Sequence, residues 1–209
     1  NGYNYCIPNH NEIFEDGLGN RLHIELFKPF VLENFSDLNV QLIDGDRPVV
    51  QEGSFHFNEE LFNNCPDWVC LHGFFQTEKY FKNIEQEIRE DFRFKDDILI
   101  PCKEMMDEFG EPPLSLHIRR GDFLINSANH HNLGLDYYEK ALAEFPMEVP
   151  VLIFSDDPDW CSEQELFADD RFLVAEGNSP YVDMCLMSMC EGHIIANSSF
   201  SWWGAWLAN

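Results

Sequence analysis

The sequence is short of positive charge. Its 209 residues include 13 lysines and arginines against 38 aspartates and glutamates, which gives a formal net charge of -25 at pH 7. Nucleic acids and anionic membrane surfaces bind clusters of cationic side chains, so this composition argues against both as broad partners. Any anionic ligand must therefore be bound by a local cluster of cationic side chains.

Other features are missing as well. The sequence has no stretch of about 20 apolar residues, which a membrane span needs, and no recognisable secretory signal peptide. None of its seven cysteines forms the C-x-x-C pair typical of zinc and redox sites. We therefore expect free thiols in a reducing compartment. The predicted location is cytoplasmic for a microbial or viral source, and this prediction includes association with a membrane surface.

The composition nevertheless supports a folded α/β protein. Hydrophobic residues make up 44% of the chain, enough to build a core. Beyond the prolines of FGEPP (109–113), β-type runs alternate with helical segments, which predicts βαβ units and a mostly parallel, doubly wound sheet. We place a domain division there, between 1–110 and 111–209. The predicted strands are 114–118, 151–155, 171–175 and 193–197, and the predicted helices are 136–145, 157–167, 179–192 and 200–207.

Local signals support these boundaries. Asp136, Asp157 and Ser179 are predicted N-caps, and Gly192 is predicted to stop the helix before it. The first half is less regular. It contains a predicted strand at 3–7 and an amphipathic helix at 78–92.

Polar residues follow the predicted strands of the second half. Arg119 and Arg120 follow the first strand, Asp156 and Asp157 the second, and the serine-rich run NSSFS (197–201) the last. Ligands of open α/β sheets bind at the carboxyl ends of the strands. Arginines grip phosphate with charge-assisted bonds, and free N–H groups at a helix start favour an anion. This pattern predicts a diphosphate clamp, although no G-x-x-x-x-G-K-[ST] loop exists.

Simpler interpretations of the same residues stay open. The arginine pair could form a surface turn with a local salt bridge, and Asp157 could serve only as an N-cap. The stretches DGD (44–46) and DPD (157–159) resemble the D-x-D pattern that holds a divalent ion under a nucleotide diphosphate. The second opens a helix, where acidic residues are favoured in any case.

Several segments together resemble one known family. HIRRGD (117–122) is similar to the H-x-R-R-x-D motif of the α-1,2-fucosyltransferases of glycosyltransferase family 11. LHGFFQTEKYF, FSDDPDWC and YVDMCLMSMCEGHIIANSSFSWWGAWL resemble that family in the same order, from about Leu71 to the C-terminus. The resemblance implies a GT-B-like fold of two Rossmann-type domains. Residues 1–110 would be the acceptor-side domain and 111–209 the GDP-sugar-binding domain.

The resemblance also implies an activity. A galactoside α-1,2-fucosyltransferase moves L-fucose from GDP-β-L-fucose to O2 of a terminal galactose in a glycan. The reaction inverts the anomeric centre and uses no metal or other cofactor. The alternatives are another GDP-sugar, another fucose linkage, or a non-catalytic nucleotide- or sugar-binding remnant.

Residue roles follow from the same resemblance. Arg119 would hold the β-phosphate with Arg120 in support, His117 would contact the guanosine, and Asp122 would organise the arginines or act as the general base. Glu176 is a second candidate base. The other implied donor-binding residues are Asp157, which would read the guanine, Asp156 beside it, and Ser198, Ser199, Phe200 and Ser201 around the diphosphate.

One family element is out of place. The family opens with a G-G-L-G-N-Q loop, but nothing precedes NGYNYCIPNH here. The stretch GLGNR (17–21) copies part of that loop on the wrong side of YCIPNH, which indicates a chance match or an insert. We therefore expect a fragment that lacks the extreme N- and C-terminal segments.

Overall fold

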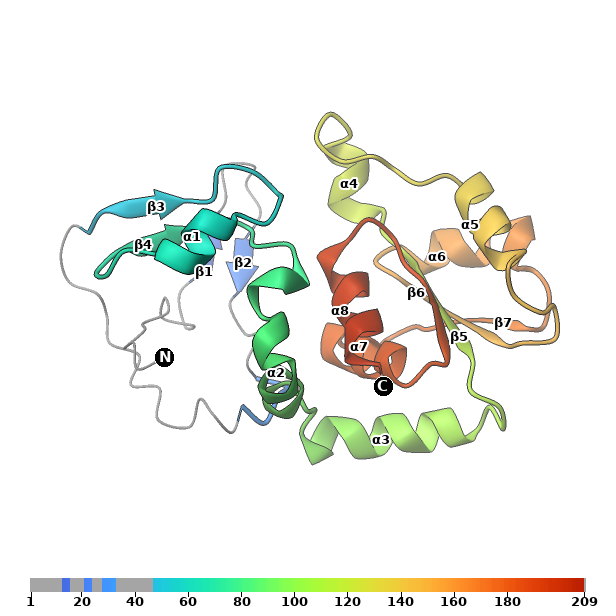
Figure 1. The fold of residues 1–209 in the computed structure, drawn as a ribbon. Coiled ribbons are helices and arrows are strands. Elements are labelled where there is room, and N and C mark those ends of the chain that lie inside the picture. Colours follow the sequence, from blue (N-terminus) through green and yellow to red (C-terminus); the bar gives the residue numbers. More distant parts are fainter. Residues whose placement is uncertain (1–12, 16–20, 24–27, 33–46, 209) are drawn as a thin grey trace. The chain divides into compact units, whose positions relative to one another are not determined.

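The chain folds into two compact units, Asn1–Arg93 and Phe94–Asn209 (Figure 1). The computed structural model describes residues 13–15, 21–23, 28–32 and 47–208. The predicted strand at 3–7, the DGD stretch at 44–46 and residues 17–20 of the GLGNR stretch lie outside the described residues.

The N-terminal unit contains two small strand pairs. Strands β1 and β2 pair antiparallel, and strands β3 and β4 pair parallel. In place of the single predicted helix at 78–92, two short 3-10 turns precede an α-helix, because the backbone leaves the helical conformation at Phe81 (φ -136°) and Ile84 (φ -128°). The elements of this unit are β1 (Ile13–Glu15), β2 (Arg21–His23), β3 (Val49–Gln51), α1 (Glu59–Asn64), β4 (Cys70–His72), the 3-10 turns Glu78–Tyr80 and Lys82–Ile84, and α2 (Glu85–Asp91).

A buried carboxylate organises this unit. Glu52 accepts hydrogen bonds from the backbone N–H groups of Phe74 (3.0 Å) and Phe75 (2.7 Å) and from the hydroxyl of Tyr80 (2.9 Å). These bonds lower the pKa of Glu52, with the Phe75 bond the largest cause, and keep its side chain ionised. Glu52 therefore holds the end of β3 against the loop that follows β4.

The C-terminal unit alternates strands and helices as the sequence predicts. Its elements are α3 (Asp96–Asp107), β5 (Leu114–Ile118), α4 (Gly121–Ile125), α5 (Leu135–Leu142), β6 (Val151–Ser155), α6 (Pro158–Ser162), the 3-10 turn Glu165–Phe167, β7 (Phe172–Val174), α7 (Pro180–Ser188), β8 (Gly192–Ile194) and α8 (Ser199–Leu207).

The four strands form one parallel sheet in the order β7-β6-β5-β8. Leu114 pairs with Val151 of β6 on one side and with Gly192 of β8 on the other. All five residues of β5 are buried, as expected for a central strand covered on both faces. The α/β class and the parallel sheet predicted from the sequence are confirmed.

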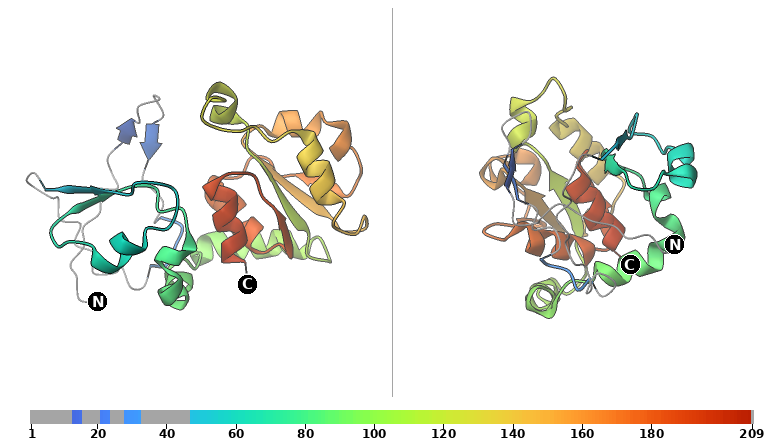
Figure 2. Two further views of the ribbon diagram at one scale, coloured as in Figure 1. Left: turned by 45° about the horizontal axis from the view of Figure 1, so that its top comes forward. Right: turned by 90° about the vertical axis from the view of Figure 1, so that its left-hand side faces the viewer.

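Helices cover both faces of this sheet (Figure 2). Leu114, Leu116 and Ile118 point to one face, where they form the main apolar core with Tyr138 and Leu142 of α5 and with further residues of α6 and β6. The alternation of a strand sends Ser115 and His117 to the opposite face, toward α8. Helix α8 packs against α7, which packs in turn against α3.

Two local expectations were wrong. Gly134 is the N-cap of α5, and Asp136 lies in the first turn, where it pairs with Lys140 instead. Helix α7 ends at Ser188, and Gly192 begins β8. A Cβ at Gly192 would lie 2.7 Å from a methyl carbon of Leu114, so glycine permits the close pairing of β8 with β5.

Helix α3 was not predicted, because Pro101 sits inside it and proline removes one helical hydrogen bond. Its Cys102 is fully buried and donates to the backbone carbonyl of Val182 in α7 at 3.8 Å. This packing places α3 in the C-terminal unit, so the division between units falls at Arg93–Phe94, before the predicted one at 110/111.

The part of the chain that the structure describes has six cysteines, all of them free thiols: Cys65, Cys70, Cys102, Cys161, Cys185 and Cys190. Within the same ranges, no helix is both long and apolar enough to cross a membrane.

Candidate active site

The predicted site residues lie at one edge of the sheet. Because the four strands are parallel, the residues after β5, β6 and β8 emerge at the same edge. Strand β5 leads to α5 on one face, whereas β8 leads to α8 on the other. The boundary between β5 and β8 is therefore a topological switch point, where open α/β sheets bind ligands.

Asp156 organises the loop that carries the arginines. One of its oxygens accepts from the backbone N–H of Arg120 at 2.8 Å, and the other binds the Arg119 guanidinium at 2.8 Å. Asp122 binds the same guanidinium at 2.6 Å. A Cβ at Gly121 would collide with the Asp156 carboxylate, so the glycine lets the two loops approach. Arg119 is thus held between two carboxylates that the sequence assigned to the site.

Arg120 is held by a separate set of contacts. Its Nε donates to an oxygen of Asp157 at 2.9 Å, and its guanidinium lies 3.7 Å from the ring centre of Trp160. The other oxygen of Asp157 accepts from the backbone N–H of Trp160 at 3.4 Å and caps α6, which confirms the predicted N-cap. Trp160 was missed by sequence reasoning, because only the fold brings α6 against the arginine loop.

The three serines at the start of α8 differ in their contacts and exposure. Ser198 is the N-cap, and its hydroxyl accepts from the backbone N–H of Phe200 at 3.3 Å. The Ser201 hydroxyl is fully buried and bonds the carbonyl oxygens of Ala196 and Ser198, both at 3.1 Å. Ser199 is exposed. The hydroxyl of Ser199 and the N–H groups at the helix start are therefore the groups best placed to meet an anion.

His117 is buried and incompletely bonded. It is 4% exposed and lies beside Phe200, with 5.5 Å between ring centres. Among the residues that the structure describes, its Nδ1 has no hydrogen-bond partner. Burial, helped by the positive charge of Arg119, lowers the pKa of His117 to about 4. A neutral imidazole with an unsatisfied nitrogen is unusual in a protein interior and marks a candidate ligand contact.

Sequence reasoning missed one half-buried ionisable group in this unit, Asp183. Asp183 lies in the first turn of α7 and accepts a hydrogen bond from the Asn178 side chain at 3.0 Å. Burial raises the pKa of Asp183, and the bond from Asn178 partly offsets this effect. In the sequence, an acid in a first helical turn carries no signal beyond the helix dipole.

No group of three or more histidine, cysteine, aspartate or glutamate side chains that could hold a metal ion is found among the described residues. In the DPD stretch (157–159), Asp157 binds Arg120 instead.

Residues 54–209 match a known family. The profile of Glycosyl transferase family 11 aligns with residues 54–209, which cover both arginines and the start of α8. The chain belongs to glycosyltransferase family 11. It is therefore a member of an enzyme family whose recognisable motifs fall on the sheet edge described above.

Curated relatives agree with this assignment. The chain is 41% identical over 166 residues to an alpha-1,2-colitosyltransferase of Escherichia coli, an alignment that covers 75% of the chain and 57% of the relative. It is 36% identical to the O-antigen biosynthesis glycosyltransferase WbnK of the same species, with 71% and 55% covered. Human galactoside alpha-(1,2)-fucosyltransferase 1 is 23% identical, with 72% and 46% covered. The family 11 chain thus spans about half the length of these relatives.

Among solved structures, a crystal structure of the alpha-1,6-fucosyltransferase NodZ soaked with GDP-fucose is similar to the chain. The sequence identity is 17%, the TM-score is 0.46, and the match covers 71% of the chain and 56% of NodZ.

Proposed function

We propose that the protein transfers L-fucose from GDP-β-L-fucose to O2 of a terminal galactose in a glycan, with inversion at the anomeric carbon. The observation that carries this proposal is that two positively polarised elements follow the neighbouring strands β5 and β8 at the same edge of the sheet. These are the carboxylate-held Arg119 after β5 and the free N–H groups at the start of α8. Together they suit a diphosphate. Membership of glycosyltransferase family 11 supports a sugar as the group that is transferred.

The proposed roles use the contacts within the site. Arg119 holds the β-phosphate and stabilises the charge that develops on the leaving GDP, while Asp122 and Asp156 orient its guanidinium. Arg120, fixed on Trp160, supports the same loop. The Nδ1 atom of neutral His117 contacts the guanosine.

Asp157 is proposed to read the guanine while it caps α6, since a carboxylate has more acceptor positions than its two present bonds use. Ser198, Ser199, Phe200 and Ser201 surround the diphosphate, with the buried Ser201 contributing through the helix backbone.

The reaction is a displacement. The bond between the acceptor oxygen and C1 of fucose forms while the bond from C1 to the diphosphate oxygen breaks. GDP leaves with the electron pair, and the hydroxyl proton passes to a base. Asp122 could serve as that base only after giving up its 2.6 Å ion pair with Arg119.

At the level of architecture, we propose a GT-B-like arrangement. Residues 111–209, which carry the parallel sheet, would be the GDP-sugar-binding domain, and residues 1–110 would belong to the acceptor side. The parallel sheet of the C-terminal unit supports its Rossmann-type character.

The test is the variant Arg119→Ala. We expect turnover of GDP-fucose with a galactose-terminated acceptor to fall about 10²- to 10³-fold or more, because a preorganised donor to the leaving group is lost. Arg119→Lys should also be severely impaired, because lysine lacks the planar fork.

A matched control is Arg171→Ala. Arg171 lies in the same unit, stacks 4.6 Å from the ring centre of Phe172 and bonds two backbone carbonyls, but belongs to no predicted site. Circular dichroism checks that each variant folds. Wild-type turnover in Arg119→Ala would contradict the proposal, and GDP binding without any transfer by the unaltered protein would favour the non-catalytic alternative.

A second candidate is the transfer of colitose, a dideoxy relative of fucose that lacks the 3-hydroxyl. The 41% identity to an alpha-1,2-colitosyltransferase favours it. A donor screen with GDP-fucose and GDP-colitose at equal concentration separates the two, because the better substrate has the higher kcat/KM.

A further inference from the structure

Two paired strands of the N-terminal unit are followed by loops that carry exposed aromatic rings. Strands β3 and β4 are parallel, and the backbone N–H of Glu52 extends their pairing by donating to the carbonyl of His72 at 2.9 Å. The loops 53–58 and 73–77 follow. Because both loops leave the carboxyl ends of parallel strands, they occupy the edge where α/β sheets bind ligands.

The two loops bring a pair of phenylalanine rings together at the surface. Phe55 is 63% exposed and Phe74 is 72% exposed. Their ring centres lie 5.4 Å apart, and their planes are inclined at 39° to each other. Large apolar side chains that are exposed together mark a binding surface more strongly than single ones do. We call Phe55 and Phe74 the aromatic platform.

The loop that carries Phe74 is held in a strained conformation. Buried Glu52 accepts hydrogen bonds from the backbone N–H groups of Phe74 and Phe75. A Cβ at Gly73 would lie 2.5 Å from the Cβ of Glu52, so glycine permits this approach. Phe75 has a left-handed φ of 48°, which is rare for a bulky residue, and its ring packs 5.2 Å from that of Tyr80. Strain held in place by a buried carboxylate is expected of a preorganised binding surface.

The platform differs from other exposed apolar residues of this unit. Val49 and Leu71 lie on the strands themselves, whose faces parallel sheets usually cover with other elements, so their exposure needs no ligand. Trp68 is 78% exposed but precedes β4, at the amino end of that strand, and the Arg47 guanidinium lies 5.1 Å from its ring centre. The platform lies at the carboxyl end.

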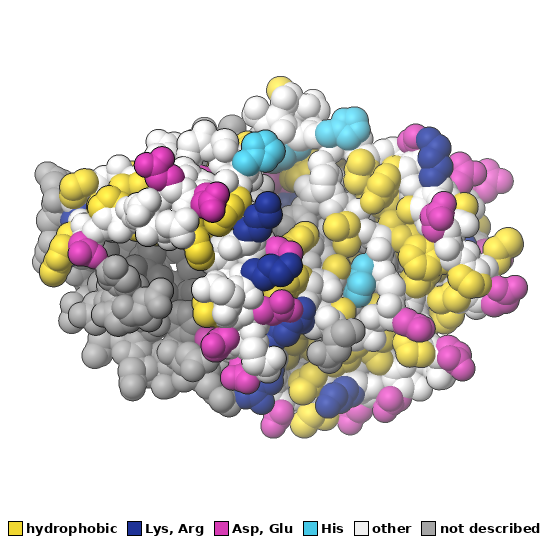
Figure 3. Space-filling view, viewed as in Figure 1, with side chains coloured by type: hydrophobic (Ala, Val, Ile, Leu, Met, Phe, Trp, Pro, Cys, Tyr) yellow, Lys and Arg dark blue, Asp and Glu magenta, His cyan; other side chains and the backbone are white. Residues whose placement is uncertain are grey.

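The chemistry of the two loops suits a neutral sugar. The face of an aromatic ring is electronegative and attracts the weakly positive C–H groups of a sugar ring. Exposed Ser54, His56 and Gln76 on the same loops can bond hydroxyl groups. Acidic side chains also reach the surface of this unit (Figure 3), and Glu59 and Glu60 follow the first loop at the start of α1. These negative charges disfavour an anionic ligand.

We propose that the aromatic platform binds a sugar ring of the acceptor glycan by stacking. The inference rests on the proposed transferase function and deepens it, because it names the part of residues 1–110 that holds the acceptor. Both rings lie within the stretch that matches glycosyltransferase family 11. The platform binds and orients the acceptor and takes no part in the proton transfer.

The test replaces one ring at a time in the full-length protein, with lactose as a galactose-terminated acceptor. Phe55→Ala and Phe74→Ala should each raise KM for lactose about 3- to 10-fold, as for the loss of one aromatic contact. The kcat at saturating lactose and the Kd for GDP should stay within about twofold. Phe74→Trp keeps an aromatic face and should retain the wild-type KM. Because both rings are exposed, the urea midpoint of unfolding should not change.

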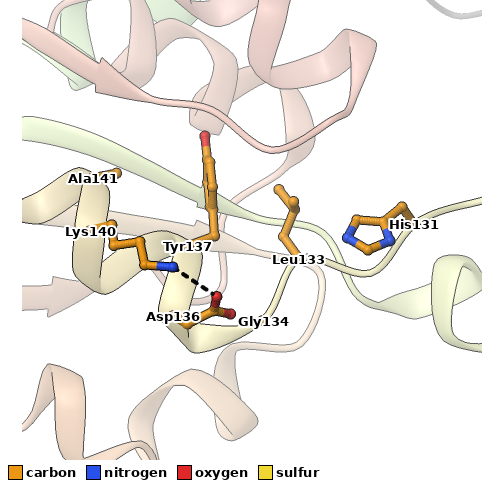
Figure 4. A pocket seen from close by; sticks show the side chains of 7 residues that line it. All are labelled: His131, Leu133, Gly134, Asp136, Tyr137, Lys140 and Ala141. Carbon is orange, nitrogen blue, oxygen red and sulfur yellow. Dashed lines mark hydrogen bonds and ion pairs between the residues drawn. The ribbon is translucent and has the colours of Figure 1, made fainter.

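Two matched controls separate the platform from other surfaces. Trp68→Ala removes an exposed aromatic ring from the amino end of β4 and should leave KM for lactose unchanged. Lys140→Ala alters a hollow at the start of α5 in the C-terminal unit, where Lys140 pairs with Asp136 at 3.4 Å (Figure 4). It should also keep the wild-type KM. A raised KM in either control, with a normal KM in Phe74→Ala, would place the acceptor elsewhere and overturn the proposal.

A binding measurement keeps this inference separate from the proposed function. Saturation-transfer NMR detects lactose on the protein without any donor. If the unaltered protein transfers no sugar but binds lactose, and Phe74→Ala does not bind it, the proposed function fails and the platform stands as a sugar-binding surface. If Arg119→Ala is inactive while Phe55→Ala and Phe74→Ala bind and use lactose normally, the transferase function stands and the platform is refuted. A lower urea midpoint in Phe74→Ala with unchanged lactose binding would show a structural role and would also refute it.

Discussion

The close approach of Gly121 to Asp156 leads to a specific prediction about the loop that carries Arg119 and Arg120. In Gly121→Ala, the new Cβ would displace the Asp156 carboxylate. Two bonds would weaken, namely the one from the Arg120 N–H and the ion pair with Arg119, both at 2.8 Å.

The cost can be worked from these bonds. A hydrogen bond to a charged group contributes about 1.5–3 kcal/mol. The ion pair adds less than 1 kcal/mol, because Arg119 and Asp156 keep 33% and 24% of their side-chain surface exposed. Alanine at the first position of α4 restores about 0.5–1 kcal/mol of stability, because it loses less backbone freedom on folding than glycine does. We therefore expect Gly121→Ala to lower the free energy of unfolding by about 1–3 kcal/mol.

Urea unfolding measures this change, and calorimetry with GDP should show at least a tenfold weaker Kd. Gly53→Ala is the matched control, because a Cβ at Gly53 meets nothing within 4 Å, and it should change stability by less than about 0.5–1 kcal/mol. The decisive comparison repeats Gly121→Ala in an Asp156→Ala background, where the obstructing carboxylate is gone. An equal cost in both backgrounds would refute the reasoning.

The remaining predictions concern His117 and the serines of α8. The pKa of His117 falls from 6.5 in the unfolded chain to about 4 in the folded protein, so the unfolded state binds more protons between these values. Stability should therefore decrease by about 3 kcal/mol as pH falls from 7 to 4, and urea unfolding of His117→Gln should lack this part of the pH dependence. Ser201→Ala should lower stability by about 1 kcal/mol and leave the Kd for GDP within twofold, because its hydroxyl bonds only backbone carbonyls. Ser199→Ala should leave the free energy of unfolding nearly unchanged and weaken the binding of GDP. A loss of GDP affinity in Ser201→Ala alone would show that the serine roles are misassigned.

Local sequence signals correctly predicted those features of the C-terminal unit that depend on only a few neighbouring residues. Asp157 and Ser179 are N-caps as expected, since a cap depends only on its own side chain and the next three backbone groups. Gly134 took the cap expected of Asp136, and Gly192 proved to be needed for strand packing against Leu114. Helix α3 could not be predicted, because packing of Cys102 against α7 offsets the disadvantage of Pro101.

By itself, the sequence determined the α/β class, the edge of the sheet where the polar residues gather, and the family. These follow from hydrophobic periodicity and from motifs that are contiguous in the chain. Only the tertiary structure decided which side chains meet there. Asp156 against Gly121, Arg120 on Trp160, and Asn197 bound to the His131 backbone join loops after different strands. Such contacts depend on strand order and register, which place residues far apart in the sequence within bonding distance.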